Sequence, residues 1–176
     1  MTAAPRTPAG RLLSAIDAIS EWTGRAVAWL TLAMVLATVA VVVLRYAAGL
    51  GLIWLQESVN WMHAAVFMLG AAYTLKADEH VRVDVFYREM SPRARAAVNL
   101  AGTLLFLLPL CAFLVVESWP WVASSWRVGE RSREAGGLPM LYLLKSLIPL
   151  MAALIAAQGI AGGVRAVLAL RASRPD

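Results

Sequence analysis

Cysteine and histidine are scarce in this chain of 176 residues, which contains one cysteine, Cys111, and two histidines, His63 and His80. A single cysteine excludes an intrachain disulfide and any paired-cysteine redox or zinc motif. Two histidines that fall in an apolar block and in a loop are not placed to hold one haem between them. We therefore expect no metal site and no cofactor.

Charge is also scarce, because only 15% of the residues are charged whereas 60% are hydrophobic. A typical soluble domain has about 25% charged and about 45–50% apolar residues. So few charges cannot cover a water-facing surface, which indicates a membrane protein. The net charge is +5, but the basic residues flank apolar blocks. This pattern is typical of anchoring at lipid headgroups, and we expect no nucleic-acid partner.

Four blocks without Asp, Glu, Lys or Arg predict four transmembrane helices. Each block is long enough to cross a hydrocarbon core of about 30 Å. The predicted spans cover about residues 26–45, 58–75, 96–116 and 146–165. They form a single four-helix transmembrane domain over residues 11–170, between a flexible N-terminal tail at 1–10 and a C-terminal tail at 171–176. The predicted fold class is an all-α membrane protein.

The distribution of lysine and arginine predicts the orientation of the chain. Eleven of the 16 basic residues lie in the two termini and the connection between the second and third spans. Because cytoplasmic segments carry the excess of basic residues, both termini are expected in the cytoplasm. Tryptophans near the span ends, five of them on the outer side, are typical of the two membrane interfaces.

Two connecting segments have their own helical signals. Residues 11–22 place Leu12, Ile19 and Trp22 on one face and turn Asp17 and Glu21 away from it, which predicts a short amphipathic helix lying along the inner interface. The pair Ser91-Pro92 is typical of an N-cap followed by proline at the first helical position, so the third long helix is expected to begin near Pro92.

The spans contain no charge that could compensate a transported ion, and proteins that move ions through their own helices normally carry one. Transport by this chain alone is therefore disfavoured. The sequence also contains no Ser/His/Asp, HExxH or phosphate-loop pattern. We expect no enzyme and no catalytic residues.

Polar and small residues in the spans mark possible helix contacts. Asn60 and His63 share one face of the second span; they either form a hydrogen-bonding seam against a partner helix or lie near the outer interface and bond water. Gly159 and Gly163 allow close backbone approach in the fourth span, either within this chain or to another chain.

Charged residues at the span ends leave two alternatives open. Arg45, followed by Tyr46, closes the first span, and Glu57 opens the second on the same side of the membrane. Arg45 and Glu57 either form an ion pair across the short loop or snorkel separately to the headgroups. Lys145 opens the fourth span on that side.

Several ordered pieces of sequence resemble one family. Arg45-Tyr46 ends the first span, and Glu57 precedes the second. The segment His80-Val81-Arg82-Val83-Asp84 follows the second span, and GGLPMLYLLKSLIPL, from Gly136 to Leu150, leads into the fourth. In this order the pieces resemble the small membrane subunit of tripartite ATP-independent periplasmic (TRAP) transporters, the DctQ-like proteins.

The resemblance implies a non-catalytic subunit of the bacterial inner membrane. In such systems a periplasmic binding protein captures an organic anion, usually a carboxylate, and a large membrane subunit carries it inward with sodium ions. The small subunit would scaffold the large one and help to dock the binding protein, so its partners are these two proteins and membrane lipids. The alternatives are a self-sufficient exporter or channel that dimerises and, less favoured, a membrane redox subunit.

Two segments are expected to contribute to assembly or docking. His80, Arg82 and Asp84 belong to the family-like HVRVD segment, to which we assign a structural role in the assembled complex. Arg131 and Arg133 lie in an outer loop that also contains tryptophans. That loop is expected either to steer and hold the binding protein or to serve only as a lipid anchor.

Overall fold

The structure, a computed structural model, describes residues 8–81 and 85–172, and the regular elements of these residues are all helices. A π-helical turn at Thr103–Leu107 joins α3 to α4 without a break, and a short 3-10 helix at Tyr87–Glu89 precedes α3. The helices are α1 (Pro8–Ala48), α2 (Ile53–Lys76), α3 (Pro92–Gly102), α4 (Leu108–Val128) and α5 (Leu141–Ala172).

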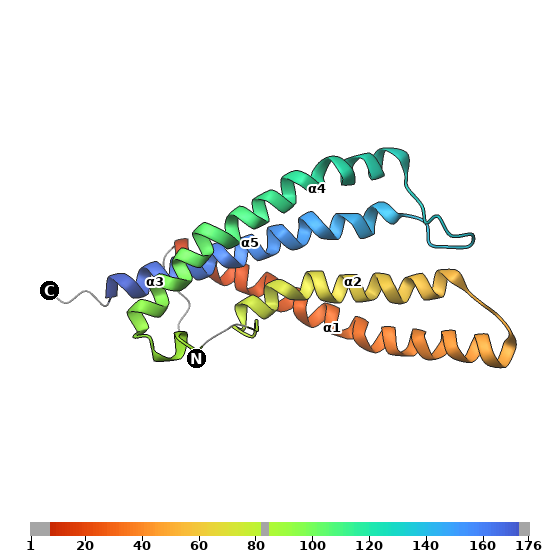
Figure 1. Cartoon of the computed structure of the whole chain (residues 1–176), viewed down its shortest axis with the longest axis horizontal. Helices are drawn as coiled ribbons and strands as arrows, with labels where there is room; N and C mark the ends of the chain where they lie inside the picture. Colours follow the sequence, from red (N-terminus) through yellow and green to blue (C-terminus); the bar gives the residue numbers. More distant parts are fainter. Residues whose placement is uncertain (1–7, 82–84, 173–176) are drawn as a thin grey trace.

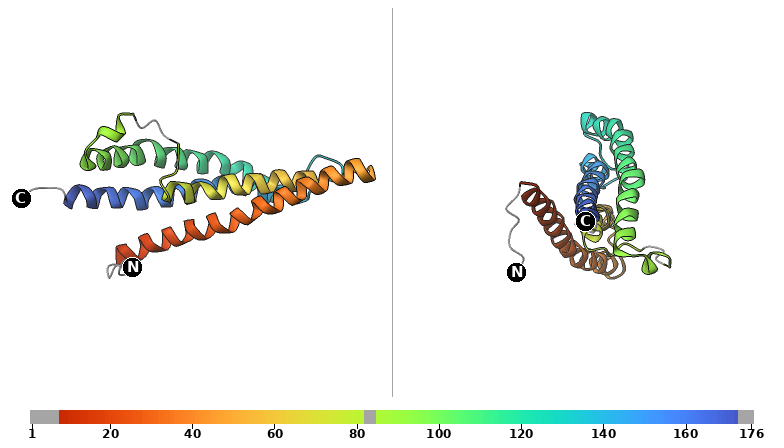
Figure 2. Two further views of the ribbon diagram at one scale, coloured as in Figure 1. Left: turned by 90° about the horizontal axis from the view of Figure 1, so that it is seen from below. Right: turned by 90° about the vertical axis from the view of Figure 1, so that its left-hand side faces the viewer.

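The long helices form a twisted layer rather than a closed bundle (Figure 1). Along this layer α1 packs on α2, α2 packs on α5, and α5 packs on α3 and α4. The contact between α1 and α5 is smaller and lies toward the end that holds both chain termini (Figure 2). The turn at residues 49–52 and the loop at residues 129–140 lie together at the opposite end.

Three helical stretches of the described chain are long and apolar enough to cross a membrane: Gly10–Ala48, Pro92–Val128 and Leu141–Ala172. The predicted spans 26–45, 96–116 and 146–165 lie within them. The fourth predicted span, residues 58–75, lies within α2, which is long enough but less apolar because it carries Ser58, Asn60 and His63. The chain is therefore an all-α, multi-pass membrane protein.

The expected separate interfacial helix at residues 11–22 is wrong, because these residues are the first turns of the single 41-residue helix α1. Gly24 does not break the helix. It lets α1 approach α2 closely, since a Cβ atom at this position would lie 2.5 Å from the ring of Tyr73. The polar and apolar residues of this segment lie on opposite faces of the helix, as the pattern predicts. However, Asp17 and Glu21 on the polar face point toward other helices, whereas Trp22 on the apolar face is 72% exposed.

The start of α3 confirms the predicted cap. The Ser91 hydroxyl accepts a hydrogen bond from the Ala94 amide at 3.3 Å, and Pro92 occupies the first helical position. Further along, the π-turn lies directly before Pro109, which lacks an N–H and would crowd the carbonyl of residue 105 in a regular helix. The wider turn, in which the Leu108 amide reaches the Thr103 carbonyl, relieves this crowding.

Candidate interaction surfaces

A cluster of polar side chains joins α1, α2 and α5 at the end of the molecule that holds the termini. The Asp17 carboxylate accepts from the Arg165 guanidinium at 2.5 Å, and the Glu21 carboxylate accepts from the Lys76 ammonium at 2.5 Å. Glu21 also pairs with Arg25 at 2.7 Å, one turn along the same helix. We call these residues, together with Ser20 and Gln158, the inner polar cluster.

Ser20 and Gln158 form the buried centre of the inner polar cluster. Their side chains are 2% and 3% exposed, and the Ser20 hydroxyl donates to the Gln158 carbonyl oxygen at 2.9 Å. The Gln158 amide donates in turn to Asp17 at 3.2 Å. Each polar atom of the glutamine side chain is thus satisfied from α1, which fixes the register of α1 against α5.

At the opposite end, Glu57 of α2 holds the loop between α4 and α5. Its carboxylate accepts from the Ser132 hydroxyl and, at 2.6 Å, from the Leu138 amide. Gly137 is needed beside it, because a Cβ atom there would lie 2.8 Å from the Glu57 carboxylate and closer still to Ser132. Arg45 is exposed and forms no ion pair with Glu57. Of the two alternatives for Arg45 and Glu57, the ion pair is therefore wrong.

A second set of contacts holds the same loop to α5. The Lys145 ammonium pairs with the Glu130 carboxylate and lies 4.0 Å from the centre of the Trp121 ring. Bonding to Lys145 lowers the pKa of Glu130 below its ordinary value. The Trp126 indole N–H donates to the Ser146 hydroxyl at 2.9 Å. The loop is therefore fixed from both sides.

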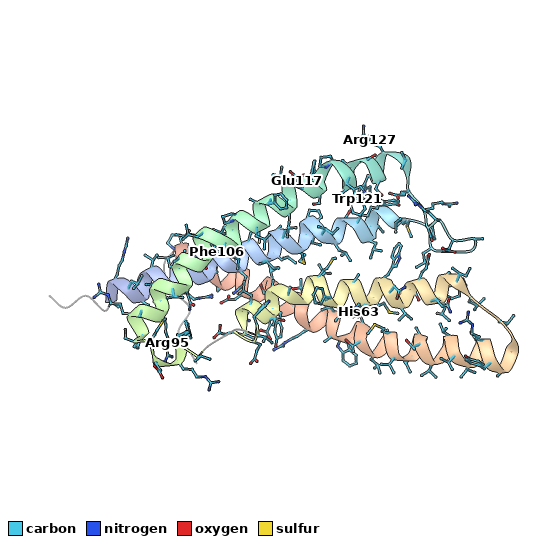
Figure 3. The ribbon with its side chains drawn as sticks, in the orientation of Figure 1. His63, Arg95, Phe106, Glu117, Trp121 and Arg127 are labelled. Atoms are coloured by element: carbon cyan, nitrogen blue, oxygen red, sulfur yellow. The ribbon has the colours of Figure 1, made fainter. Side chains whose placement is uncertain are left out.

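The fixed loop and the adjoining last turn of α4 present three arginines to solvent. Arg127, Arg131 and Arg133 are exposed, and none of them forms an ion pair within the part of the chain that the structure describes. Figure 3 shows Arg127 pointing away from the helices at the end of α4. The loop is a rigid surface with positive charge and neighbouring aromatic rings.

The predicted polar face of α2 is not covered by this chain. Asn60 and His63 are exposed, as is Phe67 one turn further on, and within the described residues neither polar side chain has a hydrogen-bond partner. Thr74, at the other end of this face, bonds the Gly70 carbonyl of its own helix at 3.1 Å. Tyr46, at the end of α1, is also exposed.

The remaining predicted contact residues lie toward the terminal end of the layer. His80 is exposed after the end of α2, and Arg82 and Asp84 lie outside the described residues. Gly159 packs within the chain against Leu107, and Gly163 packs near Leu100 and Thr103.

Sequence reasoning missed the inner polar cluster. The available signal was the spacing of Asp17 and Glu21, which places two carboxylates on one helix face together with Ser20. A glutamine within an apolar block, Gln158, with an arginine two turns later was the complementary signal on α5. The amphipathic pattern of residues 11–22 also fits a helix whose polar face meets water, and the sequence prediction assumed such a helix.

A comparison with curated proteins found no match. Residues 34–169 match the profile of the family described as "Tripartite ATP-independent periplasmic transporters, DctQ component". The match covers more than three quarters of the chain and includes all of α2, α3 and α4. The chain therefore belongs to the DctQ family, the small permease subunits of TRAP transporters.

Proposed function

We propose that this chain is the non-catalytic scaffold of a sodium-coupled TRAP transporter for organic anions, with carboxylates the favoured class, in the bacterial inner membrane. It crosses the membrane four times, with both termini in the cytoplasm. It holds the large permease subunit and helps to dock the periplasmic binding protein. The substrate and sodium sites lie in the large subunit.

The position of α2 supports a fourth span despite its lower apolarity. This helix lies between α1 and α5 in the layer, so its two sides contact protein rather than lipid. A helix flanked in this way needs less apolar surface than one surrounded by lipid. Four crossings also agree with the location of the start of α1 and the end of α5 at one end of the molecule, together with most of the basic residues that the structure describes.

The observation that carries the scaffold role is the exposed pair Asn60 and His63. His63 lies six residues beyond Glu57, which is about 9 Å along the helix axis toward the membrane centre. A polar side chain without a partner costs free energy in hydrocarbon. A polar group on a helix of the large permease satisfies Asn60 and His63 and explains why this face is left open.

The outer loop supports the docking role. Arg131 and Arg133 lie on a loop that Glu57 and Lys145 fix to α2 and α5, and Arg127 lies in the last turn of α4 beside it. A preorganised charged surface speeds encounter with a partner of opposite charge and costs little entropy on binding. We expect the binding protein to present acidic residues to this loop.

Co-expression with the large permease tests the scaffold role. Replacing Asn60 and His63 by leucine removes the polar seam, so the yield of co-purified large subunit is expected to fall. Thr38→Leu is the matched control, because Thr38 is an exposed polar residue of α1 that bonds its own helix at Met34. An unchanged yield for the α2 variant would contradict the seam, and transport by this chain alone in liposomes would favour the exporter instead.

A further inference from the structure

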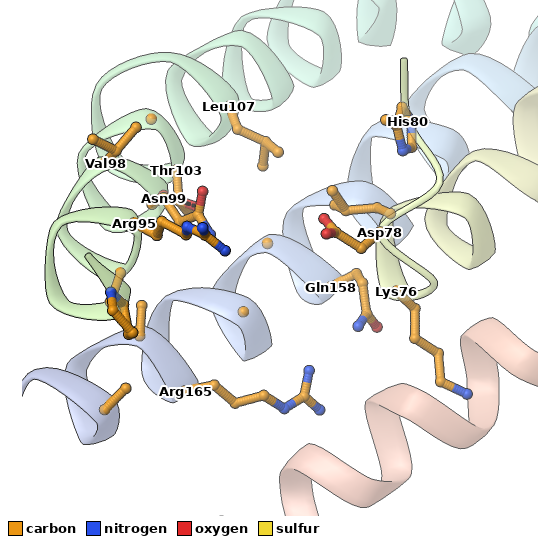
Figure 4. A pocket seen from close by; sticks show the side chains of 18 residues that line it. Lys76, Asp78, His80, Arg95, Val98, Asn99, Thr103, Leu107, Gln158 and Arg165 are labelled. Atoms are coloured by element: carbon orange, nitrogen blue, oxygen red, sulfur yellow. Dashed lines mark hydrogen bonds between the residues drawn. The ribbon is translucent and has the colours of Figure 1, made fainter. Parts of the chain in front are cut away.

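A cavity of about 760 Å³ lies between the end of α2, α3 and α5 at the end of the molecule that holds the termini (Figure 4). Sites for small ligands usually have volumes of about 300–1,000 Å³. Arg95, Asn99 and Thr103 form one wall, and Gln158 and Arg165 lie across from them (Figure 4). Lys76 and Asp78 lie at the end of α2, on the third side.

Three cations line the cavity, and they differ in how their charge is balanced. Lys76 and Arg165 pair with Glu21 and Asp17 on the far side, toward α1. Arg95 donates only to the backbone carbonyls of Met90 and Arg88, at 3.0 and 2.8 Å. The Arg95 guanidinium also lies 5.5 Å from the centre of the Tyr87 ring. Among the described residues no carboxylate forms an ion pair with Arg95, so the α3 wall carries a positive charge without an acidic partner.

Apolar residues form much of the remaining lining of the cavity, which also includes the polar side chains of Asp78, His80 and Asn99. Leu75, Val98 and Leu107 contribute apolar side chains to the lining. Gly162 also lines it, and a Cβ atom built there meets nothing within 4 Å. The cavity therefore combines a cationic rim with an apolar interior and free volume, which is the chemistry of an amphiphile with an anionic head.

We propose that this cavity binds an anionic phospholipid, with the phosphate at Arg95 and the acyl chains against the apolar wall. Given the orientation proposed above, the lipid comes from the cytoplasmic leaflet, where basic pockets between helices recognise anionic headgroups. The inner polar cluster holds Lys76 and Arg165 in place, so the rim is preorganised for the headgroup. The lipid fills space between α3 and α5 that none of the described side chains occupies.

Titration of the purified full-length chain in detergent with phosphatidylglycerol tests the site, with bound lipid counted by native mass spectrometry. Arg95→Gln removes the uncompensated charge and is expected to weaken binding roughly tenfold, the effect of losing one charge-assisted hydrogen bond. Arg93→Gln is the matched control, because Arg93 lies on the exposed face of the same helix and does not line the cavity. It is expected to bind as the unaltered chain does.

Replacing Arg95 also removes its hydrogen bonds to the backbone of Arg88 and Met90. A second variant therefore tests the cavity without changing Arg95. Gly162→Phe adds a side chain to open space in the cavity and is expected to displace the lipid, whereas Val164→Phe, on the exposed side of the same helix, is expected not to. The proposal would be overturned if Arg95→Gln and Gly162→Phe bound the lipid as tightly as the unaltered chain does. It would also be overturned if the unaltered chain bound phosphatidylcholine as tightly as phosphatidylglycerol. Binding of glycerol 3-phosphate as tight as that of the lipid would assign the site to a soluble phosphate instead. The large permease is not needed for this experiment, so failure of the scaffold role would leave the result unaffected.

Discussion

Asp17 and Arg165, separated by 148 residues in the sequence, form a 2.5 Å ion pair between the first and last long helices. The direct contact between α1 and α5 is otherwise small. This pair and the buried contact of Ser20 with Gln158 therefore determine how the first hairpin is joined to the second at the end that holds the termini.

Breaking the ion pair is expected to have a modest effect on stability. Arg165 is 43% exposed, and exposed ion pairs contribute about 0.2–1 kcal/mol. Asp17→Asn should lower the free energy of unfolding by about this amount, and the exchanged pair Asp17→Arg with Arg165→Asp should recover part of it. Chemical denaturation of the chain in detergent measures the effect. No recovery in the exchanged pair would show that Asp17 acts through Gln158 rather than through Arg165.

Replacing Gln158 is expected to cost more, because its partner is buried. Gln158→Leu leaves the Ser20 hydroxyl without an acceptor, and a buried unsatisfied polar group costs about 1–3 kcal/mol. A double-mutant cycle with Ser20→Ala isolates the interaction. Ser14→Ala is the control, since Ser14 is exposed and bonds only its own helix at Arg11. If the two single changes were additive, the hydrogen bond would contribute nothing.

Glu57→Gln is expected to loosen the outer loop while leaving α2 intact. The amide of the new side chain would meet two donors, the Ser132 hydroxyl and the Leu138 N–H, with only one oxygen to accept from them. Hydrogen exchange of the Leu138 amide should become faster. Glu134→Gln, an exposed change in the same loop, should leave this exchange rate as it is. Equal protection in both variants would contradict the role of Glu57.

The pair of Glu130 with Lys145 predicts a dependence of loop stability on pH. Because the pKa of Glu130 in the folded protein is below its ordinary value of 4.5, its stabilising contribution is complete above pH 4.5. The contribution is lost as the pH falls through the lower folded-state value. Hydrogen exchange in residues 129–140 should therefore show an acid-dependent opening that Glu130→Gln abolishes. The same opening in Glu130→Gln would assign it to another group.

Reversing two charges in the outer loop tests docking of the binding protein. With Arg131→Glu and Arg133→Glu, uptake should slow when binding protein is limiting and recover in part when its concentration is raised, because charge steers the encounter. The complex itself should still assemble, since both residues are exposed and lie outside the helices. Unchanged uptake at every concentration of binding protein would leave this loop as a lipid anchor.

Helix positions were predictable because they depend on local signals. Charge-free blocks located long helices, and Ser91-Pro92 located the start of α3, where the capping bond forms within one turn. The mistake at residues 11–22 had a physical cause. Amphipathicity shows that two faces differ, but in a membrane the polar face can turn toward other helices while the apolar face meets lipid.

The partners of individual charges were less predictable. Glu57 is close in sequence to Arg45 and yet bonds Ser132 and Leu138, which lie more than 70 residues further on. Such contacts depend on how α2 lies beside the α4–α5 hairpin, and one sequence does not encode this in any local pattern. The same holds for the cavity at Arg95, which needs the relative placement of three helices.

A layer one helix thick encloses no lumen. Each long helix is open to its surroundings on both faces of the layer. A water-filled passage along one of these faces would therefore need another chain to form its remaining walls. A solute crossing the membrane would therefore travel past this protein rather than through it. In the scaffold role proposed above, the layer is a wall past which a moving partner slides while the helices of the layer keep their arrangement.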